Sequence, residues 1–236
     1  MRLARPLPFG FAGTGGRQRC SAWEWNDHSL HLAPWRPSRS GKRSPAGYCE
    51  HAIMAVDLSA IAKWPNVPAC YDWLSLDRRG DWRLQGERVT HRGLIEFMNR
   101  QYGADDSGCW FVQNGPQRVF VELACTPWIF RRQNEGIFSH TGQPAGTIGA
   151  VYLDEDGSIL LETALGIGLL DDRDLAGFFR ECRTAACEAA DDDALLELMS
   201  GTGNPAIYWQ SLLLQRIVAV DLPKRFNFEP RPQATQ

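Results

Sequence analysis

The feature that most constrains the fold is the segment 110–131, in which two apolar runs flank a group of turn-forming residues. Residues 110–112 and 119–123 are rich in aromatic and β-branched side chains, which favour strands. Asn114-Gly115-Pro116 lies between the two runs and is typical of a tight turn. The segment therefore predicts a hairpin near the middle of the chain.

Two more hairpins are predicted around this central one. Residues 71–76 and 82–84 read as strands joined by the turn Asp77-Arg78-Arg79-Gly80. Residues 150–153 and 159–163 flank the turn Asp154-Glu155-Asp156-Gly157, whose Asp-Gly ending is a strong hairpin signal. The residues alone thus indicate a mostly antiparallel α+β protein.

A few short helices are expected between the strands. Thr90 is predicted to cap a helix over residues 91–102, where apolar residues recur at helical spacing. Further helices are predicted from Asp171-Asp172 to about Arg183, and over residues 194–200 after an acidic cap. Residues 207–220 fit either a helix or a strand, and residues 222–228 are expected to be extended.

Composition divides the chain into parts. Residues 1–53 are rich in Pro, Gly and Arg and show no persistent helical or strand period. We therefore expect the natural protein to begin at Met54. The alternatives are a basic disordered tail and an organelle transit peptide. The Gly-rich stretch 131–149 suggests a boundary between a part at 54–135 and a part at 136–228. Residues 229–236 are expected to form a disordered tail.

Charge and cysteine usage exclude some functions. Residues 1–53 carry eight basic and three acidic side chains, whereas residues 54–236 carry 17 basic and 25 acidic ones. Residues 54–236 are therefore acidic, and an acidic surface is unsuited to binding nucleic acid. No apolar run reaches the roughly 18–20 residues that a membrane-spanning helix needs. Seven widely spaced cysteines without a Cys-x-x-Cys pair indicate reduced thiols in a cytoplasmic protein.

Three segments in order carry a resemblance to known proteins. They are residues 77–86, which end in a Gly-x-Trp return strand, the capped helix 90–97 and the Trp-bearing hairpin 108–122. This order resembles a proteobacterial family of conserved hypothetical proteins and, more distantly, the domain-of-unknown-function family numbered twelve eighty-five. The resemblance covers about residues 57–228. It implies an α/β roll followed by a smaller, β-rich roll, and it carries no activity or catalytic residue over to this chain.

The central hairpin also holds the best candidate binding residues. Side-chain amides and guanidinium groups bind carboxylates or phosphates through directional hydrogen bonds, and the tip offers Gln113 and Arg118. Trp128 completes the expected contacts, with Arg79 and His91 joining if the first hairpin and the helix pack alongside. The alternative is that these polar groups serve the turn or pair across strands.

Other candidate chemistry has structural explanations. His91 and His140 are the histidines after Met54, and either could act as a general base. The spacing of Cys and His predicts no zinc site, and the acidic clusters fit turns and helix starts, where carboxylates are favoured. We therefore predict neither a metal nor a cofactor.

The best interpretation is a non-catalytic ligand-binding or regulatory module. It would hold a small anionic ligand or a peptide in the groove beside the hairpin 110–131. One alternative is a small hydrolase-like enzyme that uses His91 or His140 with a nearby carboxylate as general base. Another is a homo-oligomeric assembly protein that pairs through an exposed sheet edge.

Overall fold

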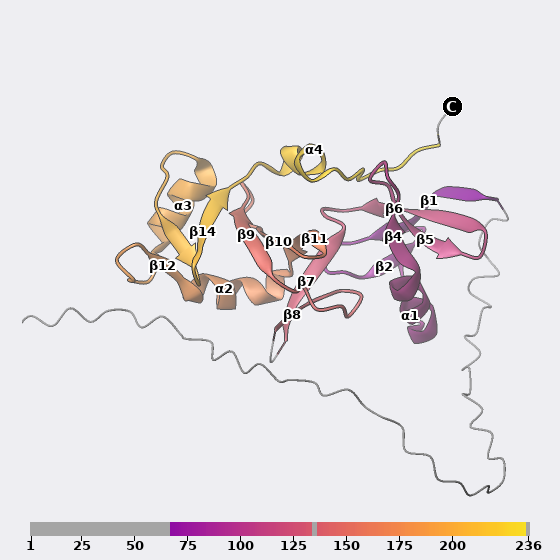
Figure 1. Ribbon diagram of the computed structural model, residues 1–236, viewed down its shortest axis with the longest axis horizontal. Helices are drawn as coiled ribbons and strands as arrows, with labels where there is room; N and C mark the ends of the chain where they lie inside the picture. Colours follow the sequence, from indigo (N-terminus) through magenta and orange to yellow (C-terminus); the bar gives the residue numbers. More distant parts are fainter. Residues whose placement is uncertain (1–66, 134–135, 235–236) are drawn as a thin grey trace, which may run out of the picture. The chain divides into compact units, whose positions relative to one another are not determined.

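The computed structural model describes residues 67–133 and 136–234, which form two β-sheets with short helices (Figure 1). The predicted α+β class is confirmed. The expectations for residues 1–53 and for a start at Met54 lie outside the described residues.

The first sheet has six strands in the spatial order β3-β2-β1-β6-β5-β4. Its part of the chain comprises β1 (Ala69–Leu76), β2 (Trp82–Leu84), β3 (Glu87–Arg88), α1 (Arg92–Gln101), β4 (Tyr102–Ala104), β5 (Trp110–Asn114) and β6 (Gln117–Leu123). The hairpins β1–β2 and β5–β6 are antiparallel as predicted. Because β1 also runs parallel to β6, the two hairpins lie side by side in one sheet.

The second sheet has eight strands in the order β12-β13-β14-β9-β10-β11-β7-β8. Its strands are β7 (Trp128–Gln133), β8 (Gly136–Ser139), β9 (Ile148–Leu153), β10 (Ile159–Thr163), β11 (Gly166–Leu170), β12 (Cys182–Thr184), β13 (Ile207–Trp209) and β14 (Leu212–Arg216). The helices of this part are η2 (Asp172–Asp174), α2 (Leu175–Glu181), α3 (Asp192–Ser200), η3 (Ala219–Asp221) and α4 (Leu222–Phe226). The second sheet therefore holds two strands more than the first.

The end of the segment 110–131 belongs to this second sheet. Its last residues lie in β7, which pairs with β8 and β11 and not with the central hairpin. The boundary predicted after residue 135 falls between β7 and β8, which pair with each other. The Gly-rich stretch therefore contains a hairpin of the second sheet.

Both faces at the centre of the second sheet are buried, which explains the uninterrupted apolar runs of β9 and β10. Tyr152 on one face of β9 packs in a core that also contains Leu74 of the first sheet. Val151 on the opposite face packs in a second core with Phe178 of α2 and Leu198 of α3. The first core thus joins the two sheets, and the second attaches α2 and α3.

Three hairpin turns share the sequence Asp-x-x-Gly and one hydrogen-bond pattern. They are residues 77–80, 105–108 and 154–157. In each, the Asp Oδ1 accepts hydrogen bonds from the backbone N–H groups two and four positions later. Each glycine has a positive φ and donates its N–H to the Asp carbonyl. A short carboxylate and a residue without Cβ are what this turn requires.

Two local predictions need correction, and the structure decides one that the sequence left open. His91, not Thr90, caps α1, because its side chain accepts the N–H of Leu94. Residues 222–226 form α4 instead of an extended segment, since Pro223 at the first turn of a helix needs no hydrogen-bond partner for its nitrogen. The ambiguous stretch 207–220 forms the β13–β14 hairpin and enters η3.

The C-terminal segment connects the two sheets. Arg225 of α4 lies over the ring of Tyr152 in β9, while the N–H of Glu229 donates to Gly108 of the first sheet. Figure 1 shows α4 and the segment after it running from one sheet to the other. Glu229 also pairs with Cys109 in a parallel β-bridge. The first residue of the predicted disordered tail is therefore paired with the first sheet.

In the described part of the chain, no helix is both long enough and apolar enough to cross a membrane.

Candidate functional site

A pocket of about 360 Å³ lies between the first and the third of the Asp-x-x-Gly turns. Its lining comprises Arg78, Arg79, Asp156, Gly157, Ser158, Leu169, Leu170, Asp172 and Leu175. The first turn therefore contributes cations, the β9–β10 turn contributes polar groups, and β11 with the start of α2 contributes an apolar surface. Of the five residues predicted for binding, Arg79 is the one that lines this pocket.

The turn that carries the two arginines is held by Asp77. Its Oδ1 accepts the N–H groups of Arg79 and Asp81, both at 2.9 Å, and its Oδ2 pairs with Arg83. Burial raises the pKa of the Asp77 carboxyl, but these hydrogen bonds outweigh burial, so the pKa lies below its ordinary value. The charged Asp77 thus fixes the backbone from which both arginines extend.

The back of this turn packs against His140. A Cβ added at Gly80 would lie 2.6 Å from the His140 Cβ, so no side chain fits between the turn and β8. Because the turn is pinned on both sides, the pocket does not depend on a mobile loop to position its arginines.

Arg78 and Arg79 differ in their partners. Arg79 forms an ion pair of 2.8 Å with Asp172, and both side chains are more than half exposed. Arg78 donates from Nη2 to the hydroxyl of Ser158 at 2.8 Å, and within residues 67–133 and 136–234 it forms no ion pair. A guanidinium has five N–H donors, so Arg78 keeps donors for a further acceptor.

The opposite wall is equally fixed. Asp154 is 1% exposed and accepts the N–H groups of Asp156 and Ser158, which shapes the β9–β10 turn. The Ser158 hydroxyl then accepts from Arg78 across the pocket. Leu169 and Leu170 of β11 also line the pocket. The pocket thus combines charged groups of both signs, Arg78 and Arg79 with Asp156 and Asp172, with an apolar surface of leucine residues.

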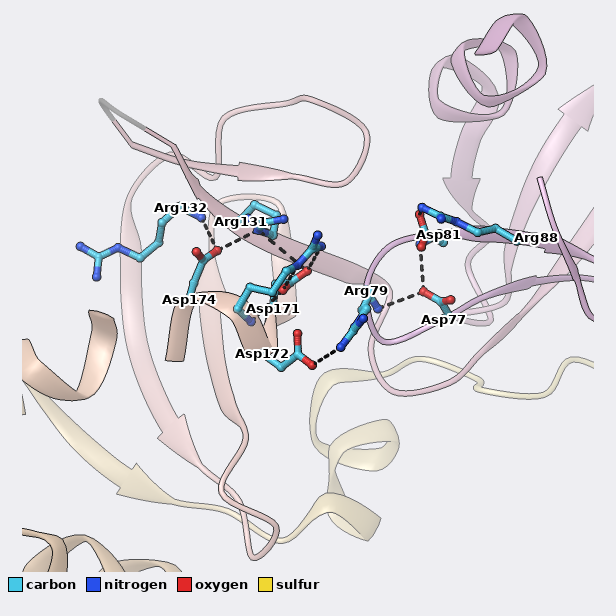
Figure 2. A network of polar contacts seen from close by, with 10 residues as sticks. Asp77, Arg79, Asp81, Arg88, Arg131, Arg132, Asp171, Asp172 and Asp174 are labelled. Carbon is cyan, nitrogen blue, oxygen red and sulfur yellow. Dashed lines mark hydrogen bonds and ion pairs between the residues drawn. The ribbon is translucent and has the colours of Figure 1, made fainter. Parts of the chain in front are cut away.

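A network of carboxylates and arginines supports the η2 side of the pocket, as Figure 2 shows. Asp171 is fully buried and accepts from the backbone N–H and the guanidinium of Arg173, with Arg131 Nε 3.8 Å away. Burial raises the pKa of the Asp171 carboxyl, but the bonds from Arg173 outweigh burial, and the pKa is lowered. The charged Asp171 thereby positions Asp172, the partner of Arg79.

The two candidate binding residues at the hairpin tip, Gln113 and Arg118, contact groups of the hairpin itself. Gln113 donates its Nε2 to the carbonyls of Gly115 and Gln117, at 2.6 and 3.2 Å, and so closes the turn. The Arg118 guanidinium lies 4.7 Å from the centre of the Phe111 ring, across the strand pair. Gln113 and Arg118 line neither the arginine pocket nor the cavity beside Trp128.

Trp128 and His91 lie elsewhere again. Trp128 is 6% exposed and lines a separate cavity at the base of the central hairpin. His91 is an exposed helix cap whose Nδ1 accepts the N–H of Leu94 at 3.1 Å. The five predicted residues are therefore distributed among the hairpin tip, two pockets and a helix start, and they do not form one site.

His140 lies in a cluster of aromatic rings. Its ring contacts those of Trp82, Tyr102 and Trp128 at centroid distances of 5.6, 5.4 and 5.8 Å. Its Nδ1 accepts the N–H of Ile129, while its Nε2 is buried without a partner among the described residues. Burial lowers the pKa of His140 to about 3. No carboxylate in the described residues bonds to either His91 or His140.

Among the described residues, no group of three or more His, Cys, Asp or Glu is arranged to hold a metal ion.

Sequence reasoning missed Arg78 and Ser158, the two residues that meet across the pocket. The pair Arg78-Arg79 inside an Asp-x-x-Gly turn was the available signal, because both side chains must project from one short turn. The turn that the two arginines face depends on how the two sheets pack, and no local sequence pattern predicts that packing.

A family model described as "Protein of unknown function (DUF2946)", with the model name DUF2944, matches residues 54–233. The chain belongs to this family. No curated protein matches the chain.

Two solved structures of DUF1285 proteins are similar to the chain. The protein from Shewanella baltica is 15% identical with a TM-score of 0.32, over 44% of this chain and 88% of its own. The protein from Silicibacter pomeroyi is 12% identical with a TM-score of 0.41, over 65% of this chain and 84% of its own. The distant similarity to family twelve eighty-five that the three sequence segments indicated is confirmed by these matches.

Proposed function

We propose that the protein is a non-catalytic binding module for a small anionic ligand with an apolar tail. The ligand's carboxylate or phosphate would bind at Arg78 and Arg79. Its tail would lie on Leu169, Leu170 and Leu175, which form the apolar base of the same pocket. A volume of about 360 Å³ suits a small molecule better than a peptide.

The observation that carries this proposal is the state of Arg78. Its guanidinium lines a pocket and is held by a neutral hydroxyl at 2.8 Å, and no ion pair in the described residues neutralises it. A guanidinium with donors to spare favours a planar anion, which it binds through two parallel hydrogen bonds. Its neighbour Arg79 brings a second cation, shared with Asp172.

The hydrolase alternative receives less support from the same geometry. A general base needs a proton to accept and a group that orients it. His91 uses its Nδ1 to cap α1, and the aromatic surroundings of His140 lower its pKa to about 3. The proposal therefore assigns no catalytic residue.

The proposal includes a cytoplasmic location. Cys70, Cys109, Cys125 and Cys182 are free thiols, and such thiols fit a reducing compartment.

A thermal-shift comparison tests the proposed function. Hexanoate, which has an anionic head and an apolar tail, is expected to raise the melting temperature of the protein increasingly as its concentration exceeds the dissociation constant. Hexanamide has the same length but no charge and is expected to produce little shift. Arg78→Gln removes the charge and is expected to abolish the hexanoate effect.

Arg88→Gln is the matched control, because Arg88 pairs with Asp81 and lies outside the pocket lining. It is expected to keep the hexanoate shift of the parent. Equal shifts with hexanoate and hexanamide, or an undiminished hexanoate shift in Arg78→Gln, would contradict the proposal.

A further inference from the structure

A second cavity, of about 230 Å³, lies at the base of the central hairpin. Three parts of the chain enclose it: the β4–β5 turn with Trp110, the start of β7 with the β10–β11 turn, and the C-terminal segment at residues 226–228. It shares no lining residue with the arginine pocket. Any ligand bound here would therefore be recognised by different groups.

The cavity contains an unused hydrogen-bond donor. Trp128 is 6% exposed, and its indole Nε1 is buried without a hydrogen-bond partner in the described part of the chain. A buried indole N–H normally has a partner, because leaving it unpaired costs about 1–3 kcal/mol. The cavity that Trp128 lines is where an acceptor could supply that partner.

A glycine lies beside this N–H. Gly166 also lines the cavity, and a Cβ built on it would lie 3.6 Å from the Trp128 Nε1. Its φ of +118° is a conformation that residues with side chains rarely adopt. The β10–β11 turn thus places no side chain of residue 166 against the indole N–H.

The walls select for a neutral ligand. The described residues that line the cavity include no Lys, Arg or His, and the charged residue among them is Asp105. Burial raises the pKa of the Asp105 carboxyl, but hydrogen bonds from Ser107 and Cys109 outweigh burial and lower the pKa, so Asp105 stays ionised near neutral pH. A second anion would be repelled here.

The other walls are aromatic. Trp110 and Trp128 meet edge to face with ring centroids 5.3 Å apart, and Phe226 and Phe228 line the side formed by the C-terminal segment. Aromatic walls favour flat, apolar molecules through edge and face contacts. A flat shape and one acceptor are therefore the features that this cavity would recognise.

We infer that this cavity is a binding site for a small neutral aromatic molecule with one carbonyl-type acceptor, which the Trp128 N–H would bind. This site is independent of the anion-binding pocket proposed above. The β4–β5 turn packs tightly on the C-terminal segment, since a Cβ on Gly108 would lie 2.5 Å from the Asn227 carbonyl oxygen. A ligand in the cavity would therefore touch the segment that joins the two sheets.

Acetophenone is the probe for this inference, and α-methylstyrene is its matched control with a similar shape and no carbonyl. Indole N–H resonances of isotope-labelled protein are followed by nuclear magnetic resonance during titration with each compound. Acetophenone is expected to move the Trp128 resonance downfield, as a new hydrogen bond does. A Trp128 resonance that stays in place at saturating acetophenone would overturn the inference.

Trp128→Phe provides the second measurement and keeps an aromatic wall. It is expected to weaken acetophenone binding about fivefold, the effect of losing one neutral hydrogen bond, and to leave α-methylstyrene binding unchanged. Equal acetophenone affinity in the variant and the parent would also overturn the inference. Arg78→Gln is expected to bind acetophenone like the parent, so this result is separable from failure of the anion pocket.

Discussion

The tip of the central hairpin and the arginine pocket are both rich in polar groups, yet they use those groups differently. At the tip, Gln113 is bonded to carbonyls two and four residues away, and Arg118 covers the adjacent Phe111 ring. In the pocket, Arg78 reaches Ser158, which is 80 residues away in the sequence. The tip satisfies itself locally, whereas the pocket is assembled from turns of two different sheets.

A dense polar cluster in a sequence is therefore weak evidence for a binding site. Neighbouring polar residues on a hairpin satisfy one another, because the turn brings their donors and acceptors together. A binding site needs donors that the fold leaves available in a concave place. Arg78 meets that requirement, and Gln113 does not.

The largest predicted effect concerns the support of the pocket. Asp171→Asn removes the buried charge that accepts from Arg173, so it is expected to lower the free energy of unfolding by about 3 kcal/mol. Urea denaturation gives this value. Asp193→Asn at the exposed first turn of α3 is the control and is expected to cost less than about 1 kcal/mol. Equal losses in the two variants would contradict the supporting role of Asp171.

The second prediction concerns pH, because His140 packs behind the turn that carries the arginines. Its pKa in the folded protein is about 3, below the ordinary value of 6.5, so the unfolded chain binds the proton more readily. Stability from this group is complete above pH 6.5 and is lost as the pH falls towards 3. The expected loss between neutral pH and pH 5 is about 2 kcal/mol.

His140→Phe keeps an aromatic ring and is expected to remove this slope between pH 6.5 and 5 in urea denaturation. The carboxylates with lowered pKa values, such as Asp77 and Asp171, act only at more acidic pH, below their ordinary value of 3.8. A variant that retains the full slope would show that another group is responsible.

The third prediction concerns the hairpin tip itself. Gln113→Ala removes the two hydrogen bonds that its amide donates within the turn, and it is expected to cost about 1 kcal/mol of stability. Hexanoate binding is expected to stay at the parent value, because the tip takes no part in the pocket. Weaker hexanoate binding in this variant would reverse the comparison between the two regions.

The smallest predicted change in stability concerns Asp172. Asp172→Asn breaks an exposed ion pair with Arg79 and is expected to change the free energy of unfolding by less than about 1 kcal/mol. Hexanoate affinity is expected to rise about threefold, since a competing anion leaves the rim of the pocket. Calorimetric titration measures this affinity, and a lower affinity would show that Asp172 helps to hold the ligand.

Much of the fold could be predicted from local patterns. The hairpin around Gly115, the turns at residues 77–80 and 154–157 and the helix closed by Gly201 all follow from the residues that such turns and caps require. The predictions failed where a local choice had two chemical solutions. His91 caps α1 although Thr90 is the more common kind of cap, and its ring nitrogen reaches the same backbone N–H.

The site could be predicted only in part. Arg79 is predicted as a contact if the first hairpin packs alongside the central hairpin, and it lines a pocket that the first hairpin forms with the β9–β10 turn. Ser158 was missed because its partner is 80 residues away, and that contact depends on the packing of two sheets. Trp128 was selected as a contact for the hairpin groove, but β7 places it in the second sheet, beside a different cavity.

The most direct test compares hexanoate binding by Arg78→Gln and Arg118→Gln in calorimetric titrations. The two variants lose the same charge from the two regions under comparison. Arg78→Gln is expected to weaken hexanoate binding at least about tenfold, the value of a lost charge-assisted hydrogen bond, while Arg118→Gln stays within about twofold of the parent. Weak binding by Arg118→Gln together with parent-like binding by Arg78→Gln would contradict the account.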